Sequence, residues 1–127
     1  MKGVLVDTSV WVDHFQHRNE ALVTLLNADM VLMHPMIQGQ LACGTPPAPR
    51  MQTLRDMECL QQSQQASLRE TMDFIELEKL YGLGCGLVDL MLLASTLITA
   101  NAELWTLDKR LAALCERFAV LHRPAFH

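Results

Sequence analysis

The sequence predicts an α/β fold, a short central parallel sheet flanked by helices, on three observations. Short, largely apolar runs occur at Val4–Val6, Met30–Met33 and Leu104–Leu107. Strands that are buried on both faces of a parallel sheet have such continuous runs. Segments of helical length separate them, and this alternation is typical of a parallel sheet sandwiched by helices. The 127 residues, 50% of them hydrophobic, are expected to form one domain, residues 1–127.

Local signals place the remaining elements. Ser9 is expected to cap a short helix that runs to Phe15. Pro35 suits the first turn of a helix, and Ser67 with Glu70 forms a capping-box pattern. The segment Gly44–Pro49 is too short for a domain linker and is interpreted as a loop between two helices. The other helices are expected at residues 21–26, 35–43, 50–62, 67–81, 88–100 and 109–117, and a last short strand at 119–121.

Bulk properties exclude several classes of protein. A net charge of −4 argues against a protein that coats nucleic acid through a broad basic surface, yet it leaves room for a nuclease with an acidic site. The four cysteines are widely spaced, so we expect reduced, mostly buried thiols in a cytoplasmic protein. We expect neither a signal peptide nor a transmembrane helix, because an acid follows the first apolar run at once and the longest apolar stretch is short.

Three carboxylates are expected to meet in one crevice. Asp7 and Asp108 each follow an apolar strand, and sites in open α/β sheets form outside the carboxyl ends of the strands. Asp89 lies near the start of an apolar helix that can project it into the same crevice. Acids beside buried elements need a compensating cation, and Mg²⁺ suits three acids without a basic partner. Singly, Asp108 is also interpretable as a helix cap and Asp7 as a turn residue.

Four segments, in order along the chain, resemble the motifs of PIN-domain ribonucleases, specifically the VapC toxins of toxin–antitoxin modules. They are Val4–Phe15, Gly39–Gly44, Gly86–Ser95 and Leu104–Leu111. The resemblance covers essentially the whole chain and implies a PIN-like α/β/α sandwich. It also implies hydrolysis of RNA phosphodiesters with the help of one or two Mg²⁺ or Mn²⁺ ions.

The resemblance assigns roles to individual residues. Asp7 and Asp89 would be the main metal ligands, and Asp108 a further ligand or an anchor for the site. The neighbouring hydroxyls would orient the carboxylates or contact phosphate, with plain helix capping as the alternative; they belong to Thr8, Ser9 and Thr106.

Gln40 departs from the family pattern, which has an acidic residue at this catalytic position. An amide is neutral and its NH₂ group donates, so it cannot neutralise charge or act as a base. The sequence therefore predicts weaker metal affinity and slower RNA cleavage than in a Gln40→Glu variant. The substitution is either natural or was introduced to disarm a toxic nuclease. The main alternative is a non-catalytic PIN-fold module that binds RNA or a protein partner.

Partners follow from the same resemblance. It implies an RNA substrate, a cognate VapB-like antitoxin that covers the acidic crevice, and a symmetric homodimer. The helices between Met51 and Tyr81 are the expected dimer interface, with buried core as the ordinary alternative. A phosphatase or a phospho-accepting receiver domain fits less well. Ser9 stands where such a phosphatase would have a second Asp, and Lys109 is the one late lysine that a receiver would use.

Overall fold

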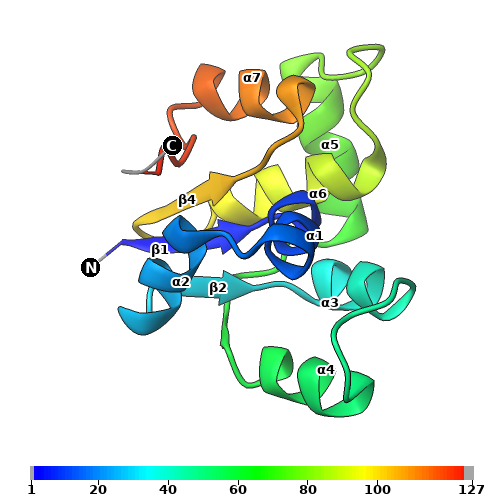
Figure 1. Cartoon of the computed structure of the whole chain (residues 1–127). Helices are drawn as coiled ribbons and strands as arrows, with labels where there is room; N and C mark the ends of the chain where they lie inside the picture. Colours follow the sequence, from blue (N-terminus) through cyan, green and yellow to red (C-terminus); the bar gives the residue numbers. More distant parts are fainter. Residues whose placement is uncertain (1, 125–127) are drawn as a thin grey trace.

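A computed structural model describes residues 2–124 of the chain (Figure 1). Within this range four strands form one parallel sheet, in the order β3-β2-β1-β4, and seven helices surround it. The predicted α/β/α sandwich is therefore confirmed. The elements are β1 (Gly3–Val6), α1 (Thr8–His17), α2 (Glu20–Asn27), β2 (Val31–Met33), α3 (Pro35–Ala42), α4 (Arg50–Glu58), β3 (Gln61–Gln62), α5 (Leu68–Glu78), α6 (Leu87–Leu97), β4 (Ala102–Trp105) and α7 (Lys109–Arg117).

Strand β1 occupies the interior of the sheet, between β2 and β4. Leu5 pairs with Leu32 of β2 on one side and with Leu104 of β4 on the other. Leu5 has no exposed surface, as expected for a strand covered on both faces. Because all the strands are parallel, β1 and β4 end at the same edge of the sheet. This edge is where the residues after Val6 and Trp105 are brought together.

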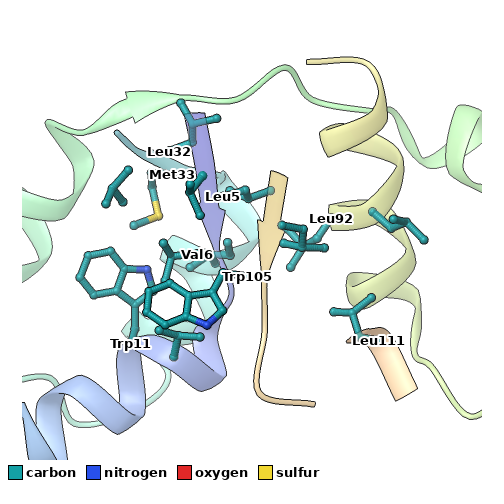
Figure 2. Close-up of a cluster of buried hydrophobic side chains, with 14 of the residues drawn as sticks. Leu5, Val6, Trp11, Leu32, Met33, Leu92, Trp105 and Leu111 are labelled. Carbon is teal, nitrogen blue, oxygen red and sulfur yellow. The ribbon is translucent and has the colours of Figure 1, made fainter. Parts of the chain in front are cut away.

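The hydrophobic core lies on both faces of the sheet. Figure 2 shows Trp11 of α1 on one side of the strands and Leu92 of α6 on the other. Trp11 is 3% exposed and Leu92 is fully buried. Removing such side chains from water contributes about 1.5–3 kcal/mol each, which fixes the position of both helices against the sheet. Helices α1 and α6 both begin beside the predicted site.

Several predicted boundaries were wrong. The strand expected at Leu104–Leu107 lies at Ala102–Trp105, and the helices expected at 67–81 and 88–100 end at Glu78 and Leu97. The helix expected to reach Gln62 ends at Glu58, and Gln61 and Gln62 instead pair with β2 as the short edge strand β3. Both glutamines are exposed, so this strand forms through backbone pairing alone and no apolar pattern in the sequence predicts it. The last strand expected at 119–121 is reduced to one parallel bridge between Leu104 and Leu121.

The cysteines are all free, as predicted, but the expectation that most are buried was wrong. Only Cys115 is buried; Cys85 is half-buried, whereas Cys43 and Cys59 are exposed. Both exposed thiols lie at the carboxyl ends of helices, directly after α3 and α4. Among the described helices, none has the length and apolar character needed to cross a membrane.

His34 joins three parts of the fold at the end of β2. Its Nδ1 accepts a hydrogen bond from the Met36 backbone N–H at 3.0 Å and so caps α3. Its Nε2 lies 3.1 Å from the Ser95 hydroxyl of α6, which also accepts from the Ala66 backbone N–H. The ring is 2% exposed, and this burial lowers its pKa from 6.5. His34 is therefore held neutral, with Nδ1 unprotonated.

This arrangement predicts a loss of stability in mild acid. The pKa of His34 is lower in the folded state, so the unfolded chain binds the proton first as the pH falls below 6.5. The free energy of unfolding should then decrease by up to about 1.4 kcal/mol per pH unit until the folded-state pKa is reached. Urea titrations between pH 8 and pH 5 measure this, with His34→Asn as the control that keeps a capping acceptor. Equal acid sensitivity in both proteins would contradict the assignment.

Candidate active site

Asp7 is a buried carboxylate at the junction of β1 and α1. It is 6% exposed and occupies the N-cap position of α1 without a side-chain capping bond. Its Oδ2 instead accepts hydrogen bonds from Ser9 Oγ at 2.7 Å and from Thr106 Oγ1 at 2.8 Å. The prediction that Ser9 caps this helix was wrong, since the N-cap position lies two residues earlier, at Asp7, and the Ser9 hydroxyl donates to the carboxylate.

Thr106 and Ser9 also hold the segment that follows β4. Thr106 Oγ1 accepts from the Asp108 backbone N–H at 3.0 Å, and Ser9 Oγ accepts from the Leu107 backbone N–H at 3.0 Å. Each hydroxyl thus donates to Asp7 and accepts from the loop that leads into α7. The two side chains orient one oxygen of Asp7 and leave Oδ1 without a hydrogen bond from any residue in the range 2–124.

Asp89 lies in the first turn of α6 and is half-buried. Burial raises its pKa above 3.8, and the negative charges of Asp7 and, less strongly, Asp108 raise it further. A hydrogen bond from the Gly86 backbone opposes this shift. The structure therefore brings the three predicted acids within electrostatic reach of one another at the carboxyl edge of the sheet.

Asp108 has the capping role that was one of its two interpretations. Its Oδ1 accepts from the backbone N–H groups of Arg110 at 2.9 Å and of Leu111 at 3.0 Å, which begins α7. The side chain is exposed, and Oδ2 accepts no hydrogen bond within the described part of the chain. One oxygen of Asp108 is thus committed to the helix, and the other remains for a ligand.

Gln40 lies on the exposed side of α3 and contacts α1 rather than the carboxylates. Its Oε1 accepts a hydrogen bond from Thr8 Oγ1, so the hydroxyl of Thr8 is directed to the amide and not to Asp7. The Nε2 group of Gln40 donates to no residue that the structure describes. The predicted set therefore divides into a carboxylate cluster and, beside it, a neutral Thr8–Gln40 pair.

The carboxylate cluster has no ion-pair partner. Asp7, Asp89 and Asp108 take part in none of the ion pairs formed by residues 2–124. The guanidinium of Arg110 lies over the loop before α6, where it donates to the Gly84 carbonyl at 3.4 Å. Concentrated negative charge without compensation is costly for folding, and it is a property of sites that bind cations.

Two of the four cysteines lie beside the acids, which the sequence did not predict. Burial and the charges of Asp89 and Asp108 raise the pKa of Cys85, and burial with the charge of Asp7 raises that of Cys115 to about 12. Both thiols are therefore protonated at neutral pH. The sequence gave a signal for this proximity only at Cys85. This residue lies between Gly84 and Gly86, just before the helix that carries Asp89.

The side chains do not form a ready-made metal cage. Within residues 2–124, no three His, Cys, Asp or Glu side chains stand in an arrangement that would hold a metal ion by themselves. What the site offers is three carboxylates near the carboxyl edge of the sheet, with two hydroxyls that fix the most buried one, Asp7.

A parallel α/β/α sheet with carboxylates gathered at its carboxyl edge matches the PIN-like sandwich that the motifs predicted. Comparisons with known proteins give the family. No family model matches, but the chain is 37% identical over 117 residues to Ribonuclease VapC32 of Mycobacterium tuberculosis, in strains CDC 1551 / Oshkosh and ATCC 25618 / H37Rv. The alignment covers 92% of this chain and 94% of the relative. The chain belongs to the VapC family of PIN-domain ribonucleases, as its motifs predicted.

The electrostatic coupling within the cluster is directly measurable. Replacing Asp7 with Asn removes the larger of the two charges that raise the pKa of Asp89, so this pKa should fall toward 3.8. Carboxyl-carbon NMR titrations in metal-free buffer follow it. Asp108→Asn should lower the pKa of Asp89 by less, and Asp73→Asn, at an exposed position of α5, should leave it unchanged. An unchanged pKa of Asp89 in Asp7→Asn would show that the two carboxylates lie too far apart to form one site.

Proposed function

We propose that this chain is a Mg²⁺- or Mn²⁺-dependent endoribonuclease toxin that hydrolyses RNA phosphodiesters, with activity reduced by Gln40. The observation that carries the proposal is the convergence of three carboxylates without an ion-pair partner among the described residues. Membership of the VapC family, whose relatives are named ribonucleases, supports it independently.

The donor set fits a hard cation. Mg²⁺ prefers carboxylate oxygens and keeps several of its waters, so it needs one or two carboxylates and no complete protein cage. Asp7, through Oδ1, and Asp89 would hold it, and Asp108 would contribute through Oδ2 or through an intervening water. Bound at this position, the ion would acidify a water and neutralise charge on a phosphate.

The protein's own residues would prepare the site for such an ion. Ser9 and Thr106 hold the Asp7 carboxylate in one orientation, which removes the cost of ordering it when the ligand binds. Arg110, fixed against the Gly84 loop, would contact a phosphate of the RNA. Gln40 adds no negative charge, so the site holds one charge fewer than the family pattern.

Substitutions of single acids test the proposed metal site. Asp7→Asn and Asp89→Asn should each weaken Mg²⁺ binding about tenfold or more and abolish RNA cleavage, because each removes a charged oxygen ligand. Gln40→Glu should strengthen binding about tenfold and increase cleavage. Calorimetry with Mg²⁺ and cleavage of total RNA provide the measurements. Asp29→Asn is the matched control, since Asp29 is an exposed acid beyond the opposite ends of the strands.

The non-catalytic alternative has one observation in its favour, which is the commitment of the Gln40 carbonyl to Thr8. If no variant bound metal or cleaved RNA, the nuclease proposal would fail and a module that binds RNA or a partner would replace it. If the Gln40→Glu variant bound metal but did not cleave RNA, the loss of nuclease activity would have a cause other than Gln40.

The proposed partners are a VapB-like antitoxin, which would cover the acidic crevice, and a second copy of the chain. We expect these contacts in the cytoplasm. The homodimer would use the exposed apolar surface between α5 and α6, which surrounds a groove of about 350 Å³. Leu77 is 79% exposed in this groove, beside Leu97 and Ile98, and belongs to the segment expected to form the interface.

A charge in the groove between α5 and α6 should separate the dimer. Leu77→Glu is expected to sediment as a monomer at concentrations at which the unaltered chain sediments as a dimer, because a carboxylate would be buried without a partner. Met36→Glu, an exposed position on α3, is the control and should remain dimeric. A monomeric unaltered chain at micromolar concentration would contradict the dimer.

A further inference from the structure

A cavity lies beside the Thr8–Gln40 pair, and none of the three acids lines it. It has a volume of about 270 Å³ and lies between α1, α3 and the loop after α3. Thr8 and Gln40 form part of its lining, so the pocket begins at the residue that follows Asp7. In Figure 1, α1 and α3 lie close together, and the loop that closes the pocket runs from α3 to α4.

The lining of this pocket suits a neutral, flat ligand. No charged side chain contributes to it, which disfavours a phosphate or a carboxylate as the occupant. Val12, Phe15, Pro46 and Pro47 supply apolar surface on two sides. Its volume is close to the lower end of the range for small-molecule sites, about 300 Å³, so it suits one small ring system.

Amide groups give the same pocket a means of recognition. The carbonyl of Gln40 is already engaged by Thr8, whereas its Nε2 donates to no described residue and remains available. The side chain of Gln16, which also lines the pocket, forms no hydrogen bond with any residue in the range 2–124. Apolar walls with a few unengaged donors and acceptors are the features that bind an unpaired nucleobase through its face and its edge.

We infer that this pocket binds one unpaired base of the RNA, adjacent to the phosphate held at the carboxylate cluster. The inference rests on the proposed function, which places RNA in the crevice beside Asp7. It gives Gln40 a role that an acidic residue could not fill, since an amide NH₂ donates to a base edge and a carboxylate only accepts. The pocket then determines which nucleotide lies next to the cleavage site.

Base removal tests the inference through binding rather than cleavage. The probes are fluorescent hexa-adenylate, hexacytidylate and hexauridylate RNAs, with versions of the tightest binder that have one abasic position each. Anisotropy is measured in Ca²⁺ buffer, in which oxygen ligands are occupied. For the unaltered chain, the loss of the base at one particular position should weaken RNA binding about tenfold or more. The loss of a base at any other position should weaken it less.

Two variants fill the pocket from opposite walls. Val12→Phe acts from α1 and Thr45→Phe from the exposed loop, so a folding defect in one leaves the other informative. In both variants, removing the base that matters most to the unaltered chain should no longer weaken RNA binding more than removing any other base. His17→Phe adds the same ring to the exposed end of α1, away from the pocket, and should keep the unaltered chain's dependence on that base. The inference would be overturned if both filled variants kept the same dependence of RNA binding on the position of the missing base. It would also be overturned if every abasic position weakened binding equally, or if the chain bound no RNA.

The outcomes separate this inference from the proposed function. If Gln40→Glu cleaves RNA in Mg²⁺ and the filled variants keep their base preference, the pocket assignment alone fails. If the base dependence is found and no variant cleaves RNA, the nuclease proposal alone fails. If the filled variants no longer bind a co-expressed antitoxin but keep the same dependence of RNA binding on the abasic position, the pocket is a protein-binding site and the inference is overturned.

Discussion

The burial of Asp7 between the carboxyl ends of two parallel strands constrains the rest of the site. The backbone N–H of Asp7 donates to the Trp105 carbonyl at 2.9 Å, which extends the pairing of β1 with β4 to the carboxylate itself. Thr106, the next residue after β4, donates to the side chain of Asp7. A buried carboxylate is costly without partners, and these bonds compensate one of its oxygens. The strand register thus determines where the charge lies and which oxygen of Asp7 is hydrogen-bonded.

The fold tolerates a concentration of negative charge at this edge. Burial and the charge of Asp7 both raise the pKa of Asp89, so the folded protein holds this carboxyl less readily in its charged form than the unfolded chain does. Sites of this kind reduce stability in exchange for binding. Gln40 lessens the accumulated charge and, through Thr8, extends the site toward a neutral pocket. The same substitution that weakens a metal site therefore suits a surface that recognises a base.

Much of the fold was predictable, because buried parallel strands such as β1 consist of continuous apolar runs and their order limits the topology. The clustering of Asp7, Asp89 and Asp108 followed from that topology. Strand β3 was not predictable, since Gln61 and Gln62 pair only through their backbones. The partners of the hydroxyls were predictable only as alternatives, and the carboxylate is the one that Ser9 and Thr106 bind. Ser9 fits a helix cap as well as a carboxylate, and the choice depends on Thr106, which lies 97 residues away.

Asp7 and Asp89 are proposed to hold one divalent cation between them. Diffraction from crystals soaked in Mn²⁺, recorded at a wavelength at which manganese scatters anomalously, tests it most directly. We expect an anomalous peak within coordination distance of Asp7 and Asp89, with the Ser9 and Thr106 hydroxyls still bonded to the other oxygen of Asp7. A crevice without a peak at saturating Mn²⁺, or a peak held only by acids outside the cluster, would contradict it.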